Sequence, residues 1–344
     1  MTIRRFLLKS LAFRVGFLAA LWLGLISFLH VRLNAESAPA DRVLMGYMPV
    51  IANLAAPLVD AVSRESGVRF EALKFASFAE MGEAFRSQHI QAAFIIAPLA
   101  VALFQQGVPL KVVYVGNRHE STMVVRQDSS CKSLSDVDGT LTVAVPIRFS
   151  GHFLAVKRYL REKGIRSDAV RLVEIPPPDM PAALASGGID GYFVGEPFAG
   201  KALASGLARR LLDVESIWPK FICNVMIVRE ELIRSHPEWV KKLVSRAARS
   251  GFWARDHSED AARFVAGYWN QDPSLPLYVF SHPPGRFRFD LFVPVVEEFE
   301  EIAREMVMEG LLDYRVDVRG MVDDRFARAV SVEEVASLKD IAAE

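Results

Sequence analysis

An internal repeat at a separation of 99 residues limits the possible folds of this chain more than any other feature. A shift of 99 residues aligns, without a gap, MGEAFRSQHIQAAFIIAPLA (81–100) with MPAALASGGIDGYFVGEPFA (180–199). The seven identical pairs are Met81/Met180, Ala84/Ala183, Ser87/Ser186, Ile90/Ile189, Phe94/Phe193, Pro98/Pro197 and Ala100/Ala199. Each copy has the pattern of a helix, a turn, a buried strand and a helix that begins with proline. Chance or shared βαβ patterning is an alternative explanation, but the unbroken register favours two similar lobes.

The rest of the chain alternates strand-length apolar runs with helical patterns, which is typical of α/β sheets. The predicted strands are Arg42–Met48, Phe70–Phe75, Ala92–Ile96, Leu110–Val115, Thr122–Val125, Leu141–Pro146, Val170–Glu174, Gly191–Gly195 and Phe221–Val228. From Arg229 onward the pattern is mostly helical, with Pro-rich loops at 273–285 and a polar C-terminal tail at 331–344. The sequence therefore predicts an α/β fold.

The composition fits a folded chain, with 51% hydrophobic and 24% charged residues. The 41 basic residues balance the 41 acidic ones, so no broad positive field indicates nucleic-acid binding. Residues 1–40 hold five basic residues against one acid, which leaves the remainder mildly acidic. Two cysteines, Cys131 and Cys223, exclude a disulfide-stapled scaffold and a four-cysteine zinc site. They could pair in an oxidising compartment, but a free, buried Cys223 is the preferred interpretation.

Residues 1–40 read as an export signal or an N-terminal membrane anchor. An uncharged apolar run at 15–31 follows basic residues, and Arg4 to Lys9 resembles a twin-arginine export signal. Small residues ending in Ala38-Pro39-Ala40 make cleavage before Asp41 plausible. An ordinary export signal and an uncleaved anchor through 15–31 are the alternatives. All three predict that 41–344 is exported to the periplasm.

Ligands of open parallel sheets lie beyond the carboxyl ends of the strands, where the unpaired N–H groups of helix N-termini also point. Two facing lobes would bring several such ends together in one cleft. The candidate ligand-binding residues at or near these ends are Tyr47, Asn53, Ser77, Pro98, Arg118, His119, Ser150, Gly151, His152, Glu196 and Trp218.

Several of these residues have simpler explanations. Tyr47 could be a core aromatic, and Asn53 and Ser150 could be helix N-caps. Arg118 could pair at the surface with Glu120. His119 could face solvent.

Glu196 is the most informative candidate, because the repeat places Ala97 at its counterpart and the fold alone does not require a carboxylate there. Interaction with a helix dipole would explain it without a ligand. We expect it to accept a hydrogen bond from a ligand or from the other lobe.

Catalytic patterns are scarce. The chain lacks GxGxxG, Walker, HExxH, GxSxG and EF-hand motifs, and its seven histidines lack metal-ligand spacing. No cofactor or metal is therefore predicted. Arg286 and Arg288, which alternate with Phe287 and Phe289, read as a loop that packs on the core.

At these residues the chain resembles the nitrate/sulfonate/taurine/bicarbonate-type substrate-binding proteins of ABC transporters. The segments that carry the resemblance are MGYMPV, LKFASFAEMGEAFRSQHIQAAFIIAPLA, GVPLKVVYVGNRHEST, KSLSDVDGTLTVAVP and GGIDGYFVGEPF. The resemblance implies a type II periplasmic-binding-protein fold, with two α/β lobes joined by crossover strands around a ligand cleft. It implies a first lobe of 41–124 plus 226–330 and a second lobe of 125–225.

The function that the resemblance implies is capture of a small anionic or zwitterionic solute and its delivery to an ABC permease and its ATPase, without enzymatic activity. Arg118 and His152 would meet the negative end of the solute. The alternatives are an enzyme of the pyrimidine-synthase or menaquinone-pathway type on the same fold, and a membrane-tethered ligand sensor.

Overall fold

The computed structural model describes residues 11–34, 42–64, 67–137, 139–313, 317–331 and 334–342. The chain forms two compact units, Met1–Arg42 and Val43–Glu344. The smaller unit contains helix α2 (Leu11–Asn34), whose apolar side chains from Val15 to Leu29 are exposed. Among the described helices, none is both long enough and apolar enough to cross a membrane. The arginine pair and the predicted cleavage site lie outside the described residues, so the export signal stays a prediction.

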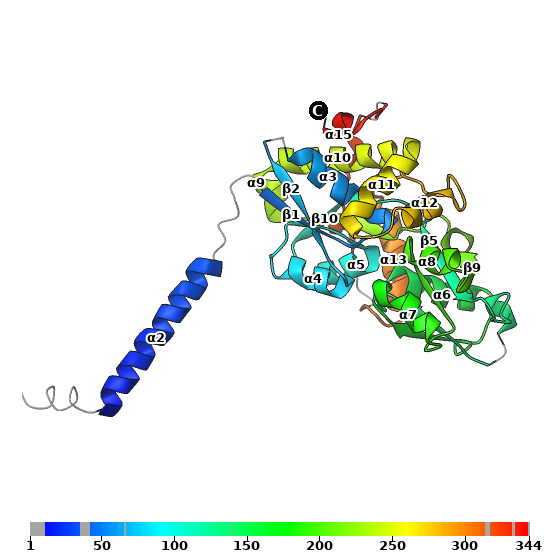
Figure 1. The fold of residues 1–344 in the computed structure, drawn as a ribbon, viewed down its shortest axis with the longest axis horizontal. Coiled ribbons are helices and arrows are strands. Elements are labelled where there is room, and N and C mark those ends of the chain that lie inside the picture. The colour runs from blue at the N-terminus through cyan, green and yellow to red at the C-terminus, as the bar shows by residue number, and fades with distance from the viewer. Residues whose placement is uncertain are drawn as a thin grey trace, which may run out of the picture. The chain divides into compact units, whose positions relative to one another are not determined.

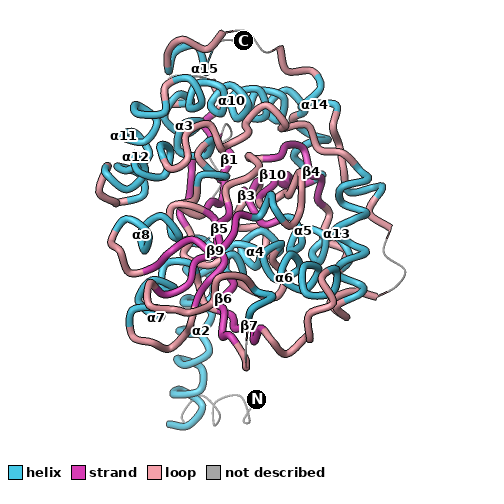
Figure 2. The backbone as a smooth tube through the Cα atoms, turned by 90° about the vertical axis from the view of Figure 1, so that its right-hand side faces the viewer, coloured by secondary structure: helices cyan, strands magenta, loops and turns pink. Residues whose placement is uncertain are grey.

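The larger unit contains two five-stranded sheets, and in Figure 2 the labelled strands of the first lie above those of the second. The first sheet has the order β2-β1-β3-β10-β4, and the second has the order β7-β6-β8-β5-β9. The strands are β1 (Arg42–Tyr47), β2 (Arg69–Lys74), β3 (Ala92–Ile96), β4 (Leu110–Val115), β5 (Ser121–Arg126), β6 (Leu141–Val145), β7 (Val170–Glu174), β8 (Gly191–Gly195), β9 (Ala208–Asp213) and β10 (Asn224–Arg229). We call each sheet with its flanking helices a lobe.

The two sheets have equivalent connections, which confirms the two-lobe α/β prediction. In the first sheet β3 is parallel to β1 and antiparallel to β10, and in the second β8 is parallel to β6 and antiparallel to β5. Strands β3 and β8 begin and end at positions 99 residues apart. All ten of their residues are buried, as the predicted apolar runs require.

The strands that change lobe are β5 and β10. β5 follows β4 along the chain but pairs with β8 and β9, whereas β10 follows β9 and returns to pair with β3 and β4. The predicted lobe boundaries, at 124/125 and 225/226, fall inside these two strands. Sheet pairing places each change of lobe at the start of the strand.

Helices cover both faces of the sheets. In Figure 1, α3 and α10 lie on one side of the first sheet, and α4 and α5 lie on the other. The α-helices are α3 (Ala55–Ser63), α4 (Phe78–Arg86), α5 (Ala97–Gln105), α6 (Gly151–Glu162), α7 (Met180–Ala185), α8 (Phe198–Ala204), α9 (Glu230–Ser235), α10 (Pro237–Asp256), α11 (Ser258–Trp269), α12 (Ser274–Ser281), α13 (Val296–Met308), α14 (Arg325–Arg328) and α15 (Leu338–Ala342). Short 3-10 helices are η1 (Ile51–Asn53), η2 (Leu134–Asp136), η3 (Pro177–Asp179), η4 (Val214–Ser216) and η5 (Arg319–Met321).

The lobes contact each other through two helix pairs. Helix α13 packs on α5 of the first lobe and on α6 of the second (Figure 2), and α12 packs on α8. Ion pairs join α6 to α13, with Arg158 bonded to Glu301 at 2.5 Å and Arg161 bonded to Glu305 at 2.5 Å. A continuous apolar cluster also extends from the first sheet to the second. The structure is therefore one in which the lobes are closed on each other.

Three local expectations differ from the structure. β9 was not predicted, because its polar residues lack a strand-like alternation. Helix α12 occupies part of the region expected to be Pro-rich loop. The expected polar tail contains α15, which packs on α3 and α10 and buries Ile341.

Candidate functional site

Nine buried polar residues meet where the strands of both lobes end and where the chain changes lobe. We call this set the polar seam. Its members come from η1, the segment before β5, β5 itself, the start of α6, the end of β8, and the start of β10. They are Asn53, Asn117, Glu120, Ser121, Thr122, His152, Glu196, Cys223 and Asn224.

One part of the seam is a chain of amides. Asn53 Nδ2 donates to the Met48 carbonyl at 3.0 Å, so Asn53 Oδ1 faces Asn224 and accepts from its Nδ2 at 2.6 Å. This order fixes Asn224 with Oδ1 pointing away from Asn53. That oxygen has no hydrogen-bond partner among the described residues.

A second part is centred on Glu120. Its Oε2 accepts from the Ala52 backbone N–H at 3.3 Å, and its carboxyl group lies near the Cys223 thiol. Burial, together with the nearby Glu196 carboxylate, raises the pKa of Glu120 to about 7. Burial and the Glu120 carboxylate raise the pKa of Cys223 well above its usual range. The thiol is therefore protonated at neutral pH.

A third part of the seam is His152, which bonds to Ser121 at the start of β5. Its Nε2 shares a hydrogen bond of 2.9 Å with Ser121 Oγ, and its ring packs against the rings of Phe193 and Phe221. Burial lowers the pKa of the imidazole to about 3, so the ring is neutral. A neutral ring can orient a solute by a hydrogen bond but cannot neutralise its negative charge.

Glu196 is bound by the protein itself. Its Oε1 accepts from Thr122 Oγ1 at 3.0 Å, and its Oε2 accepts from the Gly200 N–H at 2.6 Å. Its backbone carbonyl accepts from the Ile51 N–H at 2.8 Å, which joins the two lobes. The expected donor from the other lobe therefore exists at the Glu196 backbone. Its carboxylate is hydrogen-bonded within the second lobe and also lies 4.0 Å from Arg286 Nη1.

Several buried atoms of the seam have no hydrogen-bond partner among the described residues. They are both amide atoms of Asn117, Glu120 Oε1, His152 Nδ1 and Asn224 Oδ1. A buried polar atom without a partner costs about 1–3 kcal/mol. Their concentration at one place marks the seam as the candidate ligand contact.

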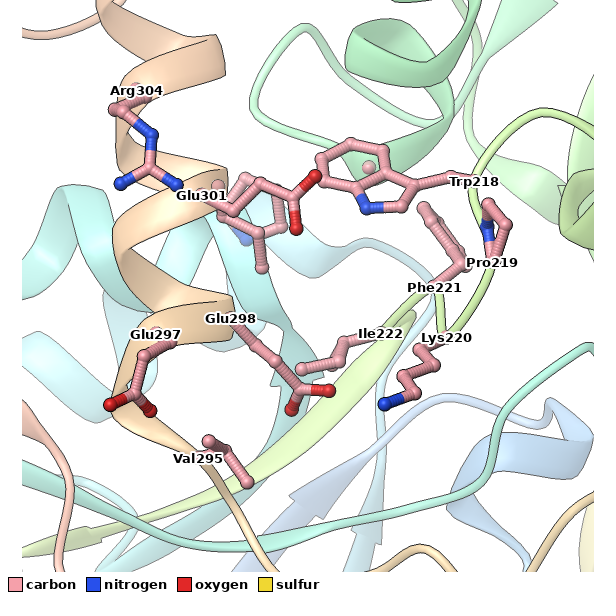
Figure 3. A pocket seen from close by; sticks show the side chains of 13 residues that line it. Trp218, Pro219, Lys220, Phe221, Ile222, Val295, Glu297, Glu298, Glu301 and Arg304 are labelled. Atoms are coloured by element: carbon pink, nitrogen blue, oxygen red, sulfur yellow. The ribbon is translucent and has the colours of Figure 1, made fainter.

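A pocket of about 480 Å³ also draws its lining from both lobes, with Pro98 from α5 and Gly151 from α6. In Figure 3, Glu297, Glu298, Glu301 and Arg304 project from α13 on one side, opposite Trp218 to Ile222. A second pocket, of about 810 Å³, includes Pro49 and Phe198. Both pockets lie between the lobes, because each is lined by residues from both of them.

The structure divides the predicted site residues into three groups. Asn53, His152 and Glu196 belong to the polar seam, and Ser150, the N-cap of α6, lies beside His152. Pro98, Gly151 and Trp218 line the 480 Å³ pocket. The last group consists of Tyr47, Ser77, Arg118 and His119, which belong neither to the seam nor to the lining of that pocket. Arg118 nevertheless bonds to two of the lining residues, Lys220 and Glu298.

Tyr47 and Ser77 have local roles. Tyr47 is buried in the core of the first lobe, and burial raises the pKa of its hydroxyl. Ser77 Oγ accepts from the Ala79 N–H as the N-cap of α4. His119 is half-buried with φ of 64°, in the left-handed region.

Arg118 is bonded to other parts of the protein. Its guanidinium bonds to Glu298 at 2.9 Å and to the backbone carbonyls of Leu291 and Lys220. The alternative in which Arg118 pairs with Glu120 is therefore wrong, and contact of Arg118 with the negative end of a ligand stays a prediction. The guanidinium fastens the crossover segment to the start of α13.

Sequence reasoning did not select Asn224, Cys223 or Arg286 for the site. Arg286 bonds to Glu215, to Thr122 Oγ1 and to the Ser121 carbonyl, and it also pairs with Asp213. Asn117 and Glu120 follow the predicted strand Leu110–Val115. Their polar side chains next to a buried strand were the sequence signal that could have identified them as site residues. Within the described ranges, no group of three His, Cys, Asp or Glu residues could hold a metal ion.

Comparison with known proteins decides the family. The model of the NMT1-like family matches residues 36–268. This chain belongs to the NMT1-like family. The taurine-binding periplasmic protein of Escherichia coli (strain K12) is 29% identical over 188 residues, which are 54% of this chain and 57% of that protein. The chain thus aligns with little more than half of this relative.

Two further matches bear on this NMT1-like chain. A ligand-binding component of an ABC-type import system from Staphylococcus aureus shares its fold, with a TM-score of 0.76 and 20% identity over 85% of this chain and 99% of that one. The 2'-hydroxybiphenyl-2-sulfinate desulfinase of Rhodococcus erythropolis is 38% identical over 78 residues, which are 23% of this chain and 21% of the enzyme. The predicted resemblance to importer substrate-binding proteins is confirmed.

Proposed function

We infer that this chain is the exported solute-binding component of an ABC-type importer. Its two lobes would close around a small solute and deliver it to a permease and ATPase. The observation that carries this proposal is the polar seam, where unpartnered buried side-chain atoms lie at the meeting of two equivalent sheets. The taurine-binding relative and the importer component of similar fold support it.

The charges around the seam favour a zwitterionic solute over a simple anion. Arg118 and Arg286 are paired with carboxylates, and His152 is neutral. A bare anion would therefore gain no uncommitted positive charge from these three groups. A zwitterion carries its own compensating charge.

Asn117→Ala provides a direct test, because neither amide atom of Asn117 has a hydrogen-bond partner among the described residues. Truncation should leave the solute-free Tm nearly unchanged, yet weaken solute binding roughly tenfold by removing ligand hydrogen bonds. Thermal shift and calorimetry of the full chain with taurine, ethanesulfonate, nitrate and bicarbonate would measure both effects. Gln105→Ala, an exposed amide at the end of α5, is the control. Equal affinity in Asn117→Ala and the wild type would contradict the proposed site.

The desulfinase match raises an enzymatic alternative, and Cys223 is the nucleophile it would offer. A reactive cysteine requires a thiolate, whereas burial and Glu120 hold the Cys223 thiol protonated. We therefore favour binding without catalysis. Turnover of an aryl sulfinate by the purified chain would favour the enzyme instead.

Residues 1–40 would supply export as a cleaved signal. A mature N-terminus at Asp41 would exclude the tethered-sensor alternative.

A further inference from the structure

Two oxygen atoms of the polar seam, Asn224 Oδ1 and Glu120 Oε1, have no hydrogen-bond partner among the described residues, and the bonds of their neighbours fix which atom is left free. Asn53 donates from Nδ2 to the Met48 carbonyl, which fixes the orientation of its amide. Asn224 donates from its own Nδ2 to Asn53 Oδ1, so the Asn224 Oδ1 atom is the one left without a partner. Glu120 presents Oε1, because Ala52 N–H is bonded to Oε2. Both are acceptors, and both are buried completely.

These two acceptors belong to one small region. The Cys223 thiol lies near the Glu120 carboxyl group, and Cys223 directly precedes Asn224 in the chain. The Gly116 N–H donates to the Asn224 carbonyl at 3.0 Å, which holds the segment leading to Glu120 against β10. Asn117 lies in the same segment, and its free amide can donate or accept.

The positive side chains nearest the seam are not available to balance an anion. Arg118 bonds to Glu298, and Arg286 bonds to Asp213 and Glu215. Arg286 Nη1 also lies 4.0 Å from Glu196 Oε1, whereas the other carboxyl group of the seam, Glu120, has no ion pair among the described residues. A ligand that brings only acceptor oxygens would face Asn224 Oδ1 and the ionised form of Glu120, with the Asn117 amide as a donor.

We propose that the seam recognises the N–H donors of an amine-bearing solute, with Glu120 Oε1 and Asn224 Oδ1 as the accepting pair. This inference rests on the proposed function and names the chemical class of its solute. The amine would give the two buried oxygens the partners that the protein does not supply. An ammonium group would also place a positive charge beside Glu120, where hydrogen bonds to a charged partner are strong.

The test compares compounds that differ only in the amine, namely taurine with ethanesulfonate and β-alanine with propionate, with nitrate as an amine-free anion. Calorimetry on the full chain should show binding of the amine member of at least one pair, at least tenfold tighter than its partner. Glu120→Gln, which keeps the shape of the side chain, should abolish most of this preference. Asp60→Asn removes a buried carboxylate in the first lobe, outside the seam and the pockets described above, and should keep the preference.

The pH dependence of amine binding by the wild-type protein tests the role of Glu120 independently, in case the Glu120→Gln variant does not fold. Burial raises the pKa of Glu120 to about 7, with Glu196 raising it further and Cys223 and Arg286 opposing that rise. Because an ammonium group favours the ionised carboxylate, amine binding should release protons at pH 6. Its affinity should rise from pH 6 to pH 8, and titration in buffers of different ionisation heat would detect the release.

The outcomes separate the two proposals. Tight binding of nitrate or an amine-free partner, unaffected by Glu120→Gln, would overturn amine recognition and leave the solute-binding function standing. Amine binding without proton release at pH 6 would also overturn the assignment to Glu120. Failure of every compound to bind would contradict both proposals.

Discussion

Replacing Arg286 with alanine is expected to lower the free energy of unfolding by about 3 kcal/mol. The guanidinium lies between segments that are far apart in sequence, bonded to Glu215 and Thr122 and paired with Asp213. Removing it leaves these carboxylates without their buried counter-charge. The expected loss is at the lower end for a buried pair, because Asp213 and Glu215 are about a quarter exposed and can regain some water.

Denaturant unfolding of the full chain would measure this change, and Arg288→Ala is the matched control two residues away. Arg288 pairs with Asp290 on the surface, where ion pairs contribute about 0–1 kcal/mol. We expect Arg286→Ala to lose clearly more free energy of unfolding than Arg288→Ala. Equal, small effects would show that Arg286 does not hold the segments together.

Gly116→Ala is expected to have the second large effect, about 2–3 kcal/mol of lost stability with weaker solute binding. A Cβ at Gly116 would lie 2.1 Å from the Ala52 backbone oxygen, a contact that no side-chain rotation can relieve. Ala52 belongs to η1, whose Ile51 N–H donates across to Glu196. A shift of η1 would therefore disturb the contact between the lobes.

Gly267→Ala controls for the change from glycine to alanine itself. Gly267 is exposed in α11, and a Cβ there meets no atom within 4 Å. Alanine at that site should be neutral or stabilising by up to about 1 kcal/mol. A Gly116→Ala protein as stable as Gly267→Ala would contradict the close approach of the crossover segment to η1.

The repeat contains more information about the fold than strand propensity does. Shifting the predicted strand Leu110–Val115 by 99 residues gives 209–214, within one residue of β9, which propensity missed. β9 is an edge strand with half-buried polar residues, so its own sequence carries little apolar pattern. Strand patterns alone did not locate the change of lobe, because strand partners are set by tertiary packing. The family resemblance placed it inside β5 and β10.

The position of strand ends predicted part of the candidate site. It identified Asn53, His152 and Glu196, which the structure places in the polar seam. It could not show that Arg118 is held by Glu298, 180 residues away. Long side chains such as arginine choose partners by three-dimensional proximity, which spacing along the chain does not reveal.

The distance between the lobes tests the central claim most directly. Spin labels at Glu83 on α4 and Ala182 on α7, positions 99 residues apart in the repeat, would report it when attached through unnatural amino acids that leave Cys131 and Cys223 untouched. Because unpartnered seam atoms favour water, the solute-free protein should show a broad distribution of distances. Adding taurine, or whichever compound of the panel raises Tm, should give one narrow, shorter distance. An unchanged distribution with the compound bound would contradict closure of the two lobes around a solute.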